Sequence, residues 1–212
     1  LTLFYSRTLL YTLEKSVDNY FLSLVFFASS MVASPGPANM ILLVAGSQYG
    51  LRKSLPFVLG IITSKQFIIW PIGFGILTFF DHFPALVVFI KSVSCIYIVW
   101  LAWKLSNFKI ANKSISLKVP SFFHGLPVHP TNPKAWAMVS VSFANYTDLS
   151  QPSFSITLMV ALVFIIVQLV FHILWCYFGY QLKQRVQGTT SEIWLMRTLS
   201  MLMLASLIVL FL

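Results

Sequence analysis

Two motifs that interrupt helices lie inside apolar stretches of this chain, and each stretch is long enough to cross a bilayer. One is Ser-Pro-Gly-Pro at residues 34–37 and the other is Thr-Asn-Pro-Lys at 131–134, so each half of the 212 residues contains one. Proline and glycine release backbone N–H and C=O groups, which cannot face lipid because each unsatisfied group costs several kcal/mol there. Such backbone is tolerated where it is buried in protein or lines a wet cavity.

The composition excludes a water-soluble fold. Apolar residues make up 58% of the chain and charged residues only 9%, whereas soluble domains carry roughly 25% charge. A net charge of +9 would suggest nucleic-acid binding in a soluble protein. Here the basic residues concentrate in loops between apolar stretches, which is typical of membrane proteins. We therefore expect the lipid bilayer as a partner and no nucleic acid.

Six apolar stretches approach or exceed the ~20 residues that an α-helix needs to span the hydrocarbon core. They predict an all-α integral membrane protein with spans at about residues 19–45, 55–79, 84–106, 121–146, 153–182 and 193–212. The two interrupting motifs fall inside the first and fourth spans. The fifth stretch exceeds the thickness of the hydrocarbon core, so we expect this helix to tilt or protrude.

The loops differ in charge. The loops after the first, third and fifth predicted spans are basic, and those after the second and fourth contain no lysine or arginine. The basic residues are Arg52, Lys53, Lys109, Lys113, Lys118, Lys183 and Arg185. Because cytoplasmic loops are enriched in Lys and Arg, we expect these three loops in the cytoplasm and both termini outside.

The loop charges and the positions of the two motifs predict two halves that insert in opposite directions. We expect an N-terminal extension at 1–18, a first three-helix repeat at 19–106, a basic cytoplasmic linker at 107–120 and a second three-helix repeat at 121–212. An inverted 3+3 repeat with a broken helix in each half is typical of secondary transporters, whose substrate sites lie at the broken helices.

Several motifs resemble those of the LysE/RhtB family of amino-acid exporters. The resemblance is carried by residues 34–39 with Gly46, Gly50, Arg52 and Lys53, by 96–104, by 131–136, and by Trp175 with Gly179. It covers roughly residues 19–212. It implies a six-helix exporter of amino acids or close derivatives in the bacterial inner (plasma) membrane, with no cofactor.

The second signature also points to a branch of that family. The Asn-Pro-Lys-Ala-Trp form at 132–136 looks most like the branch that includes cysteine and O-acetylserine exporters. The chain departs from the family elsewhere. Ser64 and Ser94 stand where the family often has glycine, Lys65 puts a charge inside the second span, and His129 and Pro130 precede the second signature.

The first interruption is a candidate substrate-binding site. Pro35 and Pro37 remove hydrogen-bond donors and stop the helix, while Gly36 permits close approach. The helix that follows begins with free N–H groups and a positive dipole end, which suit a substrate carboxylate. Asn39, in the first turn, is a candidate to hydrogen-bond a substrate or to cap the interruption. The alternative is a kink that only shapes packing.

Lys134 is the most informative single residue. An uncompensated ammonium at membrane depth costs from ~2.5 to more than 10 kcal/mol, and no acidic residue lies deep in any predicted span. We predict that Lys134 contacts backbone carbonyls at rest and a substrate carboxylate during transport. The alternative is a lysine that only ties the broken helix together. Asn132 is expected to cap or coordinate at the same interruption, which Pro133 maintains.

Lys65, His129, His172 and Trp136 are further candidates for cavity lining or proton transfer. A histidine titrates near physiological pH and can relay protons. His172 also fits a buried structural role, Trp136 fits packing, and Lys65 either faces the cavity or reaches toward the cytoplasmic side. The spacing of His124 and His129 does not place two ligands on one helix face, so we predict no metal site.

The leading functional hypothesis is a proton-driven secondary exporter of amino acids or related small zwitterionic metabolites, working by alternating access. The second is a membrane enzyme. A thiol-redox carrier would need a cysteine near each interruption, where Cys95 and Cys176 do not lie, and no HExxH or suitable Ser/His motif is present. The third is a divergent membrane protein that does not transport. The sequence leaves the substrate, the coupling ion and a homo-oligomer open.

Overall fold

The computed structural model describes residues 20–110, 119–146 and 153–205, and every regular element in these ranges is a helix. The helices are Tyr20–Ala33, α2 (Pro37–Tyr49), α3 (Leu51–Gly73), α4 (Ile76–Asp81), α5 (Pro84–Ser106), α6 (Phe122–Gly125), α7 (Pro133–Tyr146), α8 (Phe154–Val186) and α9 (Thr190–Ala205). The expectation of an all-helical protein is confirmed for these ranges. The predicted extension at 1–18 lies outside them, as does most of the predicted linker.

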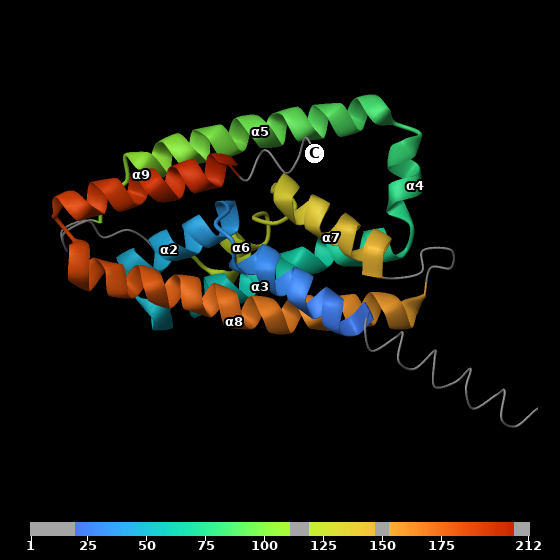
Figure 1. Ribbon diagram of the computed structural model, residues 1–212, viewed down its shortest axis with the longest axis horizontal. Coiled ribbons are helices and arrows are strands. Elements are labelled where there is room, and N and C mark those ends of the chain that lie inside the picture. The colour runs from blue at the N-terminus through green and yellow to red at the C-terminus, as the bar shows by residue number, and fades with distance from the viewer. Residues whose placement is uncertain (1–19, 111–118, 147–152, 206–212) are drawn as a thin grey trace, which may run out of the picture.

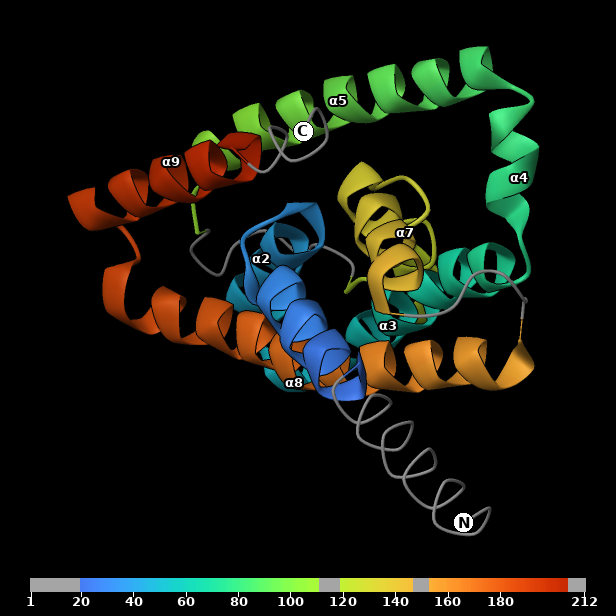
Figure 2. The ribbon, with the colours of Figure 1, turned by 45° about the vertical axis from the view of Figure 1, so that its right-hand side comes forward.

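The helices form an elongated arrangement with two long sides (Figure 1). On one side α5 and α9 lie next to each other, and on the other α8 runs almost the full length of the molecule. Helices α2 and α7 lie between these sides in both views (Figures 1 and 2), and α3 packs against α8. Both interruptions therefore lie in the middle of the molecule.

A buried apolar cluster holds the two interruptions together. The helix Tyr20–Ala33 buries Leu24, Ala28 and Val32, which are four residues apart and so lie on one face. The cluster continues through Ile68, Ile69 and Ile72 of α3, Val139 and Phe143 of α7, and Val160, Phe164 and Val167 of α8. The end of the first helix and the start of α7 are thus packed against the same parts of α3 and α8.

Helices α2 and α8 approach each other closely at two glycines. A Cβ atom added at Gly46 would lie 1.8 Å from the carbonyl oxygen of Cys176, and one added at Gly179 would lie 2.0 Å from that of Leu43. Small residues that let helix backbones approach are typical of helix packing in membranes. Close packing therefore accounts for two of the glycines in the sequence motifs.

Three membrane spans are recognisable within the described residues. Helices α3 and α8 are each long and apolar enough to cross a bilayer, and the pair Tyr20–Ala33 and α2, bent by 56°, passes the same test as one broken span. The interruption at 34–36 thus breaks an apolar stretch, as expected. The full arrangement of six spans in a 3+3 repeat stays a prediction.

Two predicted spans differ from the observed helices. The second predicted span, at about 55–79, corresponds to α3, which ends earlier, at Gly73, and a turn at Gly75, with φ 91°, separates it from α4. In the fourth predicted span only the four-residue α6 precedes the interruption, and residues 126–132 are not helical. Pro127, Pro130 and Pro133 provide the reason, because none can donate a backbone hydrogen bond.

The described residues at the start of each of the three expected basic loops lie at one end of the molecule (Figure 1). The junction between α2 and α3 and the end of α8 line one cleft, which includes Gly50, Lys183 and Gln187. Gln187 in turn donates a hydrogen bond to the carbonyl of Ile110, which follows α5, at 3.1 Å. Ile110 is buried and packs in one apolar cluster with Leu182 of α8 and Met196 of α9.

Glu192 joins these chain segments. Its carboxylate is buried and accepts hydrogen bonds from the backbone N–H of Ile110 at 2.5 Å and of Gly188 at 2.6 Å. It lies in the first turn of α9, where a negative charge is favoured by the helix dipole. The residue therefore ties the segment after α5 to the turn between α8 and α9.

We expect Glu192→Gln to destabilise the protein by about 1.5–3 kcal/mol, the contribution of hydrogen bonds to a charged group. The amide keeps the size of the side chain but places an NH₂ group where two N–H donors converge. Thermal unfolding of the purified protein in detergent measures the effect. Asp81→Asn, the same change at an exposed residue, is the control, and equal unfolding temperatures for both variants would contradict the assigned role.

Candidate functional site

Carbonyl oxygens at the first interruption accept hydrogen bonds from side chains. The Asn39 side-chain amide donates to the carbonyl of Val32 at 2.7 Å and to that of Ser34 at 2.8 Å. The indole N–H of Trp175, on α8, donates to the carbonyl of Ala33 at 3.1 Å. Asn39 therefore caps the interruption from inside α2, and α8 stabilises it from the other side.

Lys134 connects the second interruption to the first. Its Nζ donates to the hydroxyl of Ser34 at 2.6 Å, to the carbonyl of Ser34 at 3.3 Å and to that of Pro35 at 3.1 Å. The side chain is 8% exposed. A Cβ at Gly36 would lie 3.2 Å from its Cδ and Nζ, so glycine makes room for the lysine there. The predicted contacts between Lys134 and carbonyls are present.

The residues around the second interruption determine where α7 begins and so where its second residue, Lys134, lies. The side-chain oxygen of Asn132 accepts the backbone N–H of Lys134 at 3.1 Å, which is the geometry of a helix N-cap. Pro133 is the first residue of α7, a position where its missing N–H costs nothing and its fixed φ suits the helix. Trp136 donates its indole N–H to the carbonyl of Pro130 at 3.0 Å. These contacts set the start of α7.

Two histidines and a glutamine lie next to the interruptions. His129 and His172 stack with ring centroids 5.7 Å apart. The side-chain nitrogen of Gln168 lies 2.8 Å from Nε2 of His129, so an amide N–H donates to that ring nitrogen. All three residues are buried. Neutral His129 in this arrangement carries its proton on Nδ1.

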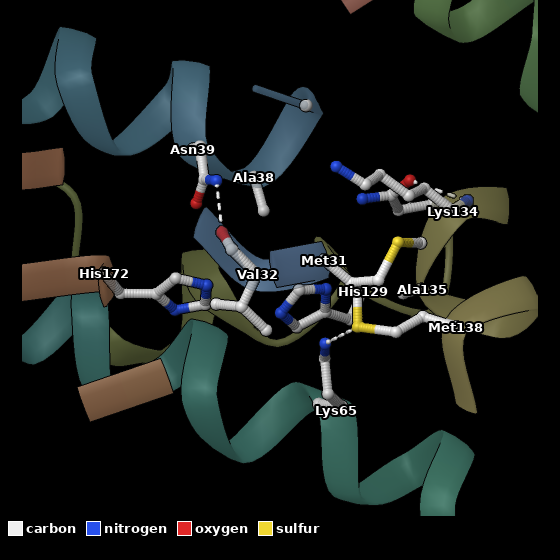
Figure 3. Close-up of a pocket in the computed structure, with 12 residues that line it drawn as sticks. Met31, Val32, Ala38, Asn39, Lys65, His129, Lys134, Ala135, Met138 and His172 are labelled. Carbon is white, nitrogen blue, oxygen red and sulfur yellow. Dashed lines mark hydrogen bonds between the residues drawn. The ribbon is translucent and has the colours of Figure 1, made fainter. Parts of the chain in front are cut away.

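These groups surround one small cavity, shown in Figure 3. Lys65 reaches toward it from α3 and His172 from α8, while Lys134 and Met138 come from α7 (Figure 3). The lining consists of Met31, Val32, Gly36, Ala38, Asn39, Lys65, His129, Asn132, Lys134, Ala135, Met138 and His172. Its volume of about 20 Å³ is enough for roughly one water molecule.

The cavity is lined by two lysines and by polar atoms that lack a hydrogen-bond partner among the described residues. Lys65 and Lys134 both line it. Within the described ranges the acidic residues are Asp81 and Glu192, and neither is in the lining. The buried atoms of the lining that lack a hydrogen-bond partner among the described residues are Oδ1 of Asn39, Nδ1 of His129 and Nδ1 of His172. Buried polar atoms normally have partners, so these fit water or a polar ligand.

The structure brings most of the expected site residues together. Those that line the cavity are Gly36, Asn39, Lys65, His129, Asn132, Lys134 and His172. Pro35 contributes a carbonyl to Lys134, and Pro37 and Pro133 begin α2 and α7. Trp136 is not part of the lining.

Sequence reasoning missed Met31, Met138 and Gln168. The signal for Gln168 was available, because it stands four residues before His172 in the otherwise apolar middle of a 33-residue helix and so shares its face. The two methionines gave no signal, because methionine is common in apolar cores. Within the described residues no three His, Cys, Asp or Glu side chains gather to hold a metal ion.

The fold and the site define a helical membrane protein with two helix interruptions around a buried polar cavity. The model of the LysE type translocator family matches residues 29–211, and the chain belongs to this family. Members of the family are transporters. No curated protein and no solved structure is significantly similar to the chain.

Proposed function

We propose that this protein is a secondary active transporter that exports amino acids or closely related small zwitterionic metabolites across the bacterial inner membrane. It works by alternating access and is coupled to protons. The observation that carries the proposal is the contact of Lys134, from the second interruption, with the carbonyls of the first. The gathering of basic loops at one end supports an orientation with those loops in the cytoplasm.

Lys134 supplies a simple way to recognise a zwitterion. When a substrate carboxylate arrives, the ammonium turns from the carbonyls of Ser34 and Pro35 to the carboxylate, forming a charge-assisted hydrogen bond. The carbonyls that it leaves then accept the substrate's ammonium. Asn39 and the first turn of α2 complete the site for the carboxylate. Lys134 thus binds the substrate's carboxylate and, by leaving the carbonyls, makes them available to the substrate's ammonium.

The size of the cavity supports alternating access. About 20 Å³ holds a water molecule but no amino acid. Substrate entry therefore requires the two interruptions to separate. This separation breaks the hydrogen bonds from Lys134 to Ser34 and Pro35. These contacts join the two halves of the chain, so the halves rock about the site, as in other transporters with repeats.

His172 is the proposed proton carrier, and His129 stacks against it. Both rings line the cavity, but both nitrogens of neutral His129 are taken, because Nε2 accepts from Gln168 and Nδ1 carries the proton. A proton taken up by His172 adds positive charge to the cavity that Lys65 and Lys134 line, which is favourable only while an anionic group is bound. Proton and substrate binding are therefore linked. The motif at 132–136 resembles that of the cysteine and O-acetylserine exporters, so small amino acids are the first substrates to test.

Export from cells tests the proposal. Bacteria that express the protein are loaded with mixed dipeptides, and extracellular amino acids are followed by mass spectrometry against cells with an empty vector. We expect faster appearance of one or a few small amino acids, and slowing when a protonophore collapses the proton gradient. Equal rates for every amino acid, with the protein inserted in the membrane, would overturn the proposed transport.

A further inference from the structure

The cavity contains a second buried lysine that the zwitterion site does not use. Lys65 is 1% exposed. Its Nζ contacts Sδ of Met138 at 3.2 Å and lies 4.6 Å from the centroid of the Phe164 ring. A thioether is a weak acceptor and a ring attracts a cation only through its quadrupole. Lys134, by contrast, has three oxygen acceptors.

Lys65 and Lys134 line the same cavity. Met138, which contacts Lys65, follows Lys134 by four residues on α7, so these two α7 residues share a face of the helix. His129 and His172 also line this part of the cavity, each with a buried Nδ1 that has no partner among the described residues. A group bound beside Lys65 would therefore meet the lysine Nζ, the unused Nδ1–H of His129 and no carboxylate from the described lining.

From this arrangement we propose that Lys65 binds a second anionic group of the substrate, so the protein transports amino acids with an acidic side chain in preference to neutral and basic ones. The inference rests on the proposed function and narrows it. The main-chain carboxylate binds Lys134 and the side-chain carboxylate binds Lys65, which gives each ammonium a counter-ion at membrane depth. A cationic side chain would be placed beside Lys65 without a compensating carboxylate in the described lining, and like charges there are strongly unfavourable.

Transport by the purified full-length protein in liposomes tests the proposal. Initial rates of uptake are compared for aspartate, asparagine, glutamate, glutamine, cysteine and lysine at equal concentration. Aspartate and asparagine are nearly equal in size, so their ratio reports the charge. We expect aspartate to be transported roughly ten- to a hundredfold better than asparagine, which is the change that one hydrogen bond between charged groups produces.

The variant Lys65→Met removes the ammonium and keeps the length and apolar stem of the side chain. We expect it to lose the preference for aspartate while it still transports asparagine. Lys91→Met makes the same change at an exposed lysine of α5 and should keep the preference. Thermal unfolding of each variant shows that it is folded.

The outcomes separate this inference from the function on which it rests. If neutral amino acids are transported and aspartate is not preferred, or if Lys65→Met keeps the preference, the second anionic subsite is wrong and the transport proposal stands. A preference for lysine would overturn the subsite in the same way. If no amino acid is transported by the folded wild-type protein, the proposed function itself fails.

Discussion

Export is expected to be lost when Lys134 is replaced by alanine. The Lys134 side chain donates hydrogen bonds from the second interruption to Ser34 and Pro35 at the first. The variant removes these contacts and the proposed ligand of the substrate carboxylate. Truncating one partner of a buried, hydrogen-bonded charge costs roughly 2–5 kcal/mol, or about thirtyfold to several-thousandfold in rate. Initial export rates in loaded cells measure this loss.

Two comparisons separate transport from folding. Lys91→Ala removes a lysine from an exposed position of α5 and should leave export unchanged. Lys134→Arg keeps the charge but not the shape of the ammonium, so it should insert normally and export poorly. If Lys134→Ala is as abundant in the membrane as the wild type and exports at the same rate, the lysine only ties the broken helices together.

The interruptions could be predicted from the sequence because their cause is local. Proline lacks a donor wherever it stands, and Pro35, Pro37 and Pro133 fall in otherwise apolar stretches. The carbonyl partners of Lys134 followed from a general argument, because a buried ammonium without a nearby acid must find oxygen acceptors. Neither inference needed any knowledge of which helices touch.

The partners across the cavity could not be predicted, because they depend on tertiary packing. Trp175 was recognised as part of a motif, but its hydrogen bond to Ala33 joins residues 142 positions apart. The sequence does not indicate that Glu192 joins two chain segments, because its partners are backbone N–H groups, which almost any residue could supply. The end of α3 was missed because Gly75 stands inside an apolar run, where hydropathy alone indicates a continuing helix.

Gly46→Ala is expected to be strongly destabilising. The added Cβ would lie 1.8 Å from the carbonyl oxygen of Cys176 and 2.7 Å from its carbonyl carbon. These are backbone atoms of α8, so no side chain can turn away and the two helices must move apart. Overpacking of this kind costs typically 1–3 kcal/mol and occasionally more. We expect a lower unfolding temperature and less protein in the membrane, measured by thermal unfolding in detergent and by immunoblotting.

Moving α2 away from α8 would also disturb the candidate site, because both helices contribute residues to it. Trp175 precedes Cys176 on α8 and donates to Ala33 at the first interruption, so separating α2 from α8 loosens that hydrogen bond. The Gly46→Ala protein that remains folded should therefore export more slowly per molecule. Val170→Ile adds one carbon at a half-exposed position of α8 and serves as the control. Equal stability of the two variants would mean that α2 and α8 are not packed at Gly46 as described.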